Sequence, residues 1–231
     1  QAPSEAEAVA YRDGVIALNK DGQLRFMSPK AFSTAKKDFG SLTEDALPVQ
    51  KLSVNNKGTL FAVTNFGSIV KIDVTTLPEK KFKEKPFKLG AGETVVKLMF
   101  FEGVPVGELV LFTKQGGAKR VDLSEFTEVS KTYLKAINLT EKDVVIGAEV
   151  VDDEKNVIEV TEQGQVLVYK ATEIPIQGRN AAGVKGIKLS DGDSVAFAGQ
   201  VEDEGEIIVV SDTGYAKRVI SSLIDPSSRY L

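Results

Sequence analysis

The sequence predicts an all-β fold, a propeller-like disc of five four-stranded blades. One unit occurs five times: a mostly apolar run, a short polar stretch, a glycine and a second, partly apolar run. The repeated glycines, which lie 45, 49, 48 and 50 residues apart, are Gly22, Gly67, Gly116, Gly164 and Gly214. In addition, no window keeps the 3.6-residue periodicity of a long helix. A regular period of this length is typical of propeller blades.

Each unit is predicted to be a tight β-hairpin. Three residues before the glycine stands a side chain that can bond backbone within a turn. These residues are Asn19, Thr64, Thr113, Thr161 and Ser211. The glycine supplies the positive φ that such a turn needs. Ten residues after the glycine an apolar residue recurs, which predicts a fixed return of the chain into the core. The set is Phe32, Leu77, Phe126, Ile174 and Ile224.

Further strands are expected between the hairpins. One group covers residues 87–89, 133–139 and 184–189, and a second covers 95–101, 144–151 and 195–201. Together with the hairpins they give about four strands per repeat, and radial packing removes the long exposed edges of such units. We therefore predict one domain over residues 11–231 without an internal boundary. Residues 1–10 resemble a linker remnant and lack the basic and apolar regions of a signal peptide.

Composition excludes several kinds of chemistry. The chain has no cysteine and no histidine, so disulfides, thiolate metal sites and the commonest general base are absent. We expect no catalytic residue, no metal and no cofactor in this domain. No apolar run approaches the 18 residues of a membrane span, and we expect a cytoplasmic protein with no membrane partner. The formal net charge is −4, so any nucleic-acid site must arise from segregated charge.

Two stretches show the repeat most clearly: TKQGGAKRVDLSEF (113–126) and SDTGYAKRVISSLI (211–224). WD40 and kelch signatures cannot occur, because the chain has neither tryptophan nor histidine. The pattern resembles the repeats in the C-terminal domains of gyrase and topoisomerase IV A subunits. EFTEVSKTYLKAINL (125–139) and IPIQGRNAAGVKGIKLSDGD (174–193) resemble the Gram-positive type of topoisomerase IV A subunit. The resemblance spans all five repeats and is weaker in the first two.

The resemblance implies a circular β-pinwheel whose outer surface binds and bends double-stranded DNA. It implies as partners an ATPase B-type subunit and the rest of the A subunit, with Mg and ATP acting elsewhere in the parent topoisomerase. Gyrases carry a Gln-Arg-Arg-Gly-Gly-Lys-Gly box after the first repeat, where this chain reads SPKAFSTAKKDFGS (28–41). Only a related stretch, from Gly178 to Gly186, occurs in the fourth repeat. The missing box favours a topoisomerase IV domain over a gyrase wrapping domain, which stays the alternative.

Basic residues recur just after the hairpin glycine and in the following loop, which predicts a cationic rim. The candidate DNA contacts are Lys36, Lys37, Lys81, Lys83, Lys85, Lys119, Arg120, Lys131, Lys135, Arg179, Lys185, Lys217, Arg218 and Arg229. Acidic clusters at 152–154 and 202–204 are expected elsewhere on each blade. Such a rim would bind phosphates without reading sequence and would be sensitive to salt.

Three other interpretations remain open. These cations could merely keep edge strands soluble. The chain could instead be a propeller that serves as a protein-interaction scaffold, or a propeller hydrolase that uses Asp or Glu. The stretch 191–194 could be taken for a calcium loop, but it lacks the rest of that pattern and a turn is the better interpretation.

Overall fold

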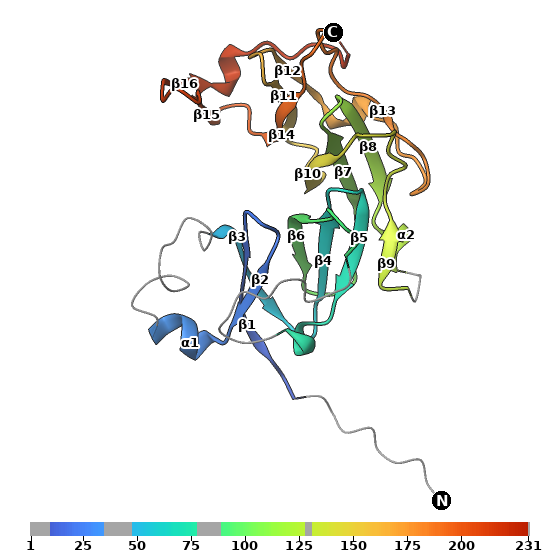
Figure 1. Ribbon diagram of the computed structural model, residues 1–231, viewed down its shortest axis with the longest axis vertical. Coiled ribbons are helices and arrows are strands. Elements are labelled where there is room, and N and C mark those ends of the chain that lie inside the picture. Colours follow the sequence, from blue (N-terminus) through green and yellow to red (C-terminus); the bar gives the residue numbers. More distant parts are fainter. Residues whose placement is uncertain (1–9, 35–47, 78–88, 128–130, 231) are drawn as a thin grey trace, which may run out of the picture. The chain divides into compact units, whose positions relative to one another are not determined.

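The structure, a computed structural model, describes residues 10–34, 48–77, 89–127 and 131–230. Strands dominate it, and each of the five sequence repeats forms one antiparallel hairpin (Figure 1). The hairpins are β1 (Asp13–Asn19) with β2 (Leu24–Met27), β4 (Thr59–Thr64) with β5 (Ser68–Ile72), β7 (Glu108–Thr113) with β8 (Gly117–Asp122), β11 (Asn156–Thr161) with β12 (Val166–Lys170), and β15 (Glu206–Val210) with β16 (Ala216–Ile220). The all-β, propeller-like prediction is confirmed.

The predicted turn chemistry is present in all five hairpins. The glycines have φ values between 73° and 86°. In the third hairpin the amide of Gly117 donates to Thr113 Oγ1 at 2.9 Å. The other four hairpins have the equivalent bond: the backbone amide of the residue after the glycine donates to the side-chain oxygen of the residue three positions before the glycine. These short polar side chains therefore define where each hairpin turns.

The described chain divides into two compact units. The first comprises residues 1–62 and 70–105, and the second comprises 63–69 and 106–231. The prediction of a single undivided disc stays a prediction.

In the first unit, β1 lies between β2 and β3 (Pro48–Asn55), and β6 (Val95–Phe101) lies beside β4. Its core contains Ile16, Phe26, Leu60 and Leu98, all of them buried. Burial along β1 and β4 is nearly continuous rather than alternating, so little of either strand is exposed to solvent.

In the second unit, the third hairpin forms a four-stranded sheet in the order β10-β7-β8-β13, with β10 at Val145–Val150 and β13 at Val184–Lys185. The fourth hairpin gains β14 (Val195–Val201) beside β11. The short strand β9 (Tyr133–Lys135) ends where the amides of Ala136 and Ile137 bond the carbonyl of Gly67. Phe112, Tyr169 and Ile174 lie in the core of this unit.

A short helical turn follows each hairpin and returns the chain to the core, as predicted. The turns are α1 (Pro29–Thr34), η2 (Val74–Thr76), α2 (Ser124–Thr127), η3 (Ala171–Glu173) and η4 (Ser221–Leu223). The apolar residue ten positions after the glycine is buried at Leu77, Phe126 and Ile174. It is only partly buried at Phe32 and Ile224. Among the described residues, no helix is both long and apolar enough to cross a bilayer.

The strand content of the blades differs from the prediction of four each. Within the described residues the first and fourth hairpins each have three strands in their sheets, and the fifth has two. The fifth hairpin leaves Ile208, Val210 and Tyr215 largely exposed. The predicted strand at 184–189 is ordered as β13 only to Lys185, since the amide of Gly186 bonds the carbonyl of Gly116 instead. Of the expected strand at 87–89, residues 87 and 88 lie outside the described residues, and Leu89 is not in a strand.

Candidate nucleic-acid interface

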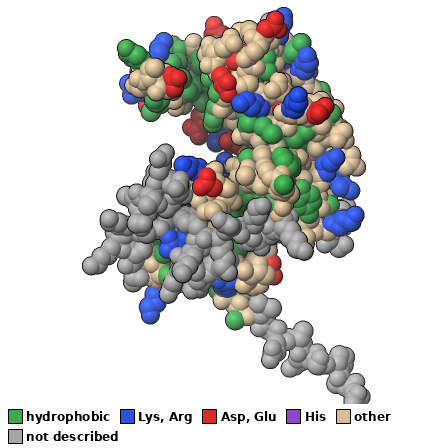
Figure 2. Space-filling view, viewed as in Figure 1, with side chains coloured by type: hydrophobic (Ala, Val, Ile, Leu, Met, Phe, Trp, Pro, Cys, Tyr) green, Lys and Arg blue, Asp and Glu red, His purple; other side chains and the backbone are tan. Residues whose placement is uncertain are grey.

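Nine of the fourteen predicted contact residues are described, and all nine belong to the second unit. The other five, Lys36, Lys37, Lys81, Lys83 and Lys85, lie outside the described residues. Figure 2 shows Lys and Arg side chains gathered along the edge of this unit that carries β9 and α2.

The first segment of this edge comprises Lys131 and β9. Because side chains alternate along a strand, Leu134 points into the core while Lys135 is exposed on the opposite side. Lys135 Nζ donates to Asn138 Oδ1 at 3.2 Å. Lys131, just before the strand, is also exposed. This segment therefore presents two ammonium groups to solvent.

The second segment is the loop from Gln177 to Gly186, which follows the length of β8. The amide of Gln177 donates to Arg120 O at 2.9 Å, and that of Gly186 to Gly116 O at 2.7 Å. Between them Gly183 has a φ of 86°, and a Cβ there would lie 2.6 Å from Ala118 O. Only glycine allows the loop to approach the strand so closely.

Arg179 and Lys185 project from this loop. Arg179 is partly exposed, and its Nε lies 3.8 Å from Glu125 Oε2 of α2. Lys185 is exposed, and its Nζ lies 5.2 Å from the centre of the Tyr230 ring. A weak ion pair and a cation–π contact orient these cations while leaving them accessible to an anion.

Arg229 joins the second segment from the end of the described chain. Its Nη1 donates to Lys185 O, and its backbone amide donates to Glu173 Oε2 at 2.8 Å. The fold thus brings together Lys185 and Arg229, which are far apart in sequence. Part of the Arg229 guanidinium is used in these internal bonds, so it offers fewer donors to a ligand than Lys185 does.

The two segments are neighbours. The amide of Asn138 donates to Ala181 O at 3.0 Å. Asn138, Gly183 and Lys185 also line one groove of 410 Å³ beside the third hairpin turn. Residues 131–138, 178–186 and 229–230 therefore form a continuous surface, which we call the basic edge.

The structure corrects the prediction for Lys119 and Arg120. Lys119 is fully buried, with its ammonium enclosed by backbone carbonyls. Arg120 is 9% exposed, and its Nε lies 3.1 Å from Glu108 Oε2. Neither presents its charge at the surface, because β13 and the 177–186 loop cover β8 in this blade. Burial lowers the pKa of Lys119 to about 8, and the nearby Glu125 carboxylate opposes that shift.

Lys217 and Arg218 occupy the same places in the fifth hairpin and are exposed there. Arg218 Nη1 pairs with Glu206 Oε1 at 3.0 Å across the β15–β16 ladder. Their exposure follows from the two-stranded state of that hairpin, since no described segment covers β16 as the 177–186 loop covers β8.

The acidic clusters form turns before β11 and β15. Lys155 Nζ lies 3.6 Å from Asp152 and 3.7 Å from Glu202, so the two clusters share a cation. Each acidic turn precedes the first strand of a hairpin, and the hairpin turn follows the other end of that strand. The length of β11 therefore places its acidic turn about 20 Å from its hairpin turn.

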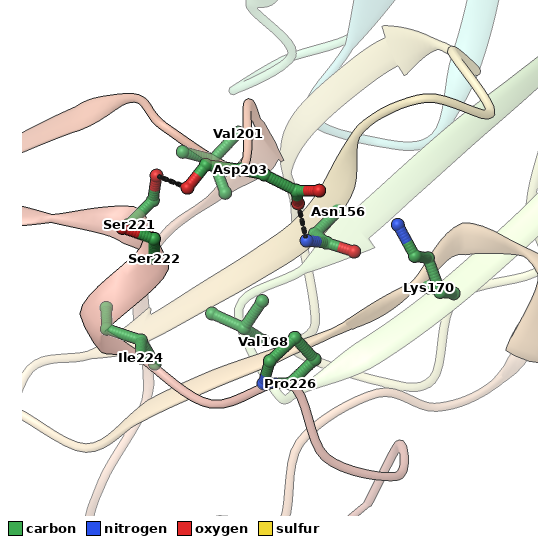
Figure 3. Close-up of a pocket in the computed structure, with 9 residues that line it drawn as sticks. All are labelled: Asn156, Val168, Lys170, Val201, Asp203, Ser221, Ser222, Ile224 and Pro226. Carbon is green, nitrogen blue, oxygen red and sulfur yellow. Dashed lines mark hydrogen bonds between the residues drawn. The ribbon is translucent and has the colours of Figure 1, made fainter.

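Sequence reasoning missed a cavity of 330 Å³ between the fourth and fifth hairpins (Figure 3). In the close-up, the Asp203 carboxylate points toward Asn156, which donates to it, and Lys170 lies beyond Asn156 on the side away from Ser221. Ser221 Oγ is bonded to the carbonyls of residues 202, 203 and 205, so it is not a poised nucleophile. The described residues hold no group of three or more acidic side chains able to bind a metal.

The comparison with protein families identifies the fold. The model of the DNA gyrase C-terminal domain, a β-propeller, matches residues 58–100, 107–152, 156–202 and 205–229, which is well over half of the chain. The chain belongs to this family. Each matched stretch contains one hairpin glycine, from Gly67 to Gly214, so each family repeat carries one of the hairpins. The gyrase A C-terminal family corresponds to the C-terminal domain of type IIA topoisomerase A subunits.

Relatives of known identity agree. The DNA topoisomerase 4 A subunit of Bacillus subtilis is 29% identical over 230 residues, covering 96% of this chain and 28% of the relative. The DNA gyrase A subunit of Staphylococcus epidermidis is 30% identical over 188 residues, covering 77% of this chain and 21% of the relative. The chain thus spans about a quarter of the length of these family members.

Solved structures of the family share the fold. The C-terminal domain of DNA topoisomerase IV superposes with a TM-score of 0.84 at 24% identity, covering 96% of this chain and 72% of that one. The gyrase A C-terminal domain gives a TM-score of 0.70 at 24% identity, covering 94% and 74%.

Proposed function

We propose that this domain binds duplex DNA through the basic edge, without reading its sequence, and steers DNA segments for a topoisomerase IV type of A subunit. The observation that carries the proposal is the convergence of Lys131, Lys135, Arg179 and Lys185 on one continuous surface. Cations that are distant in sequence and adjacent in space suit the closely spaced phosphates of a DNA backbone.

The chemistry is electrostatic rather than catalytic. Each phosphate neutralised by a lysine or arginine releases counterions, and log K falls by roughly 0.9 per contact for each decade of salt. Bending a few tens of base pairs costs on the order of 1–6 kcal/mol, so several simultaneous contacts are required to offset it. In the intact enzyme, strand passage with ATP and Mg would take place in the other domains and the B-type subunit.

The preference for topoisomerase IV over gyrase rests on residues 28–41, which lack the basic Gly-rich box that gyrases carry. A gyrase-type domain would be expected to wrap a long DNA segment tightly. A supercoiling assay with the whole enzyme distinguishes the two types, because only a gyrase is expected to introduce negative supercoils.

Charge reversal tests the choice of surface. The pairs Lys131→Glu with Lys135→Glu, and Arg179→Glu with Lys185→Glu, are each expected to lower affinity for a 30-base-pair duplex by about tenfold or more at 0.1 M salt. Gel shift or fluorescence anisotropy measures the effect, and circular dichroism confirms that the variants fold.

The matched control reverses two exposed lysines outside the basic edge, Lys57 and Lys170, and so produces the same change in net charge. It is expected to change affinity less than threefold. If both edge pairs behave like this control, DNA does not bind at the basic edge. If the unmodified domain shows no salt-sensitive binding at all, the alternative of a protein-interaction scaffold is favoured.

A further inference from the structure

Lys119 places a charged group at the centre of the basic edge without exposing it. Its side chain is fully buried on β8. The ammonium nitrogen lies 2.8 Å from Ala136 O and 2.9 Å from each of the carbonyl oxygens of Gly178, Arg179 and Ala181, so its three N–H groups are shared among four acceptors. Ala136 directly follows Lys135, so the acceptors belong to the two segments that carry the exposed cations.

The hairpin does not need a lysine at this position. The equivalent residue three places after the hairpin glycine is Val70 in the second repeat and Leu167 in the fourth, and both are buried. The first and fifth repeats have a basic residue there, Arg25 and Lys217, but neither is buried. Burying an ammonium costs more than burying an aliphatic side chain unless its hydrogen bonds are all satisfied. Among the described residues, a fully buried charge at this position is therefore found only in the third hairpin, where the 177–186 loop lies over β8.

The Lys119 ammonium organises the 178–181 loop, which has little regular structure of its own. Three carbonyls between Gly178 and Ala181 converge on one point, which their mutual repulsion would disfavour without a cation between them. One of them, Ala181 O, also accepts the amide of Asn138. The backbone that carries Arg179 is thereby curled around the ammonium and tied to the end of β9.

We propose that Lys119 is a positioning residue for DNA binding, whose buried ammonium holds the 178–181 loop and the end of β9 so that Arg179 and Lys135 face one phosphate path. The inference rests on the proposed function and adds a residue that touches no DNA. Its physical basis is preorganisation, because cations on a fixed backbone lose less conformational entropy when they bind.

The central test compares Lys119→Met with Leu167→Met, which introduces the same residue at the equivalent buried position of the next hairpin. Lys119→Met is expected to lower duplex affinity about tenfold although every exposed cation remains. It should also speed hydrogen exchange of the amides in 177–183 and 134–138. Leu167→Met should do neither. Lys155→Met removes the same single charge elsewhere and should leave affinity within twofold.

A double-mutant cycle with Arg179→Ala separates positioning from general damage to the fold. If Lys119 acts by orienting Arg179, then Arg179→Ala costs clearly less affinity in the Lys119→Met background than alone. Additive losses, or wild-type affinity and exchange in Lys119→Met, overturn the proposal. Should Lys119→Met not fold, Lys119→Leu repeats the comparison with the residue type found at position 167.

The outcome distinguishes this inference from the function on which it rests. Absence of duplex binding by the unmodified domain defeats both the DNA proposal and the positioning role. Duplex binding that is salt-sensitive in the unmodified domain and unchanged in both Lys119 variants defeats only the positioning role.

Discussion

A single buried carboxyl shows how strongly local surroundings set the chemistry of a residue in this fold. Glu159 on β11 is fully buried, and Tyr169 donates its hydroxyl to Glu159 Oε1 at 2.6 Å. Burial raises the pKa of Glu159 to about 7, while the Tyr169 hydrogen bond and the Arg229 charge oppose the shift. The equivalent residue of the third hairpin is Leu111, so the carboxyl is not a requirement of the repeat.

The raised pKa of Glu159 makes stability depend on pH. The folded state binds the proton more tightly than the unfolded state, whose carboxyl titrates near 4.5. Stability from this group is therefore complete below about pH 4.5 and falls as pH rises toward 7. The free energy of unfolding of Glu159→Gln should depend less on pH. It should exceed that of the wild type by on the order of 3 kcal/mol at pH 8 and by little at pH 4.5.

Urea unfolding at pH 4.5 and pH 8 measures this difference, with the exposed Glu141→Gln as the control for loss of one carboxyl. If wild type and Glu159→Gln lose stability in parallel as the pH rises, Glu159 is not the group that titrates.

The side chains of the turns could be predicted from the sequence, and the buried charges could not. Thr113 and Gly116 act through bonds within a few residues, so their roles are visible in the local pattern. Lys119 and Lys217 stand in the same motif, Ala-Lys-Arg-Val, yet one is buried and the other exposed. What separates them is the 177–186 loop, which comes from more than 50 residues away.

At the scale of elements, the helical return after each hairpin ties the blade to its core. Phe126 of α2 is fully buried, and its amide donates to Leu123 O at 3.1 Å. Ile224 makes the same backbone bond to Ser221 O at 2.9 Å but is only partly buried. The two repeats share this backbone turn, but its contribution to stability depends on how deeply its apolar side chain is buried.

Phe126→Ala is therefore expected to destabilise the domain by about 3–5 kcal/mol, because it removes a large side chain and leaves a cavity. Ile224→Ala, in the same position of the fifth repeat, should cost about 1 kcal/mol since less contact is lost. Chemical denaturation of the two variants provides the comparison. Equal losses would mean that the fifth return is packed as tightly as the third.

The strands at 95–101 and 195–201 match their predicted bounds, whereas those at 133–139 and 184–189 are shorter than predicted. The latter two run into segments whose amides bond hairpin glycines of other repeats, at Gly67 and Gly116. Such capping depends on tertiary partners that an apolar run does not reveal.

At the scale of the whole molecule, the proposed function depends on a separation of charge that the net charge does not reveal. The chain carries a net charge of −4, yet the second unit gathers exposed cations on the basic edge and acidic side chains in the turns around Lys155. The repeat predicted that basic loops would come together. It could not predict which members, such as Lys119 and Arg120, the fold would withdraw from the surface.

The salt dependence of duplex binding tests the central claim most directly. Four exposed cations, Lys131, Lys135, Arg179 and Lys185, predict that log K falls by about 3.6 per decade of salt, at roughly 0.9 per phosphate. Fluorescence anisotropy with two unrelated 30-base-pair duplexes should give the same slope and nearly the same affinity for both. Affinity that stays constant between low and moderate salt would contradict a phosphate-binding basic edge.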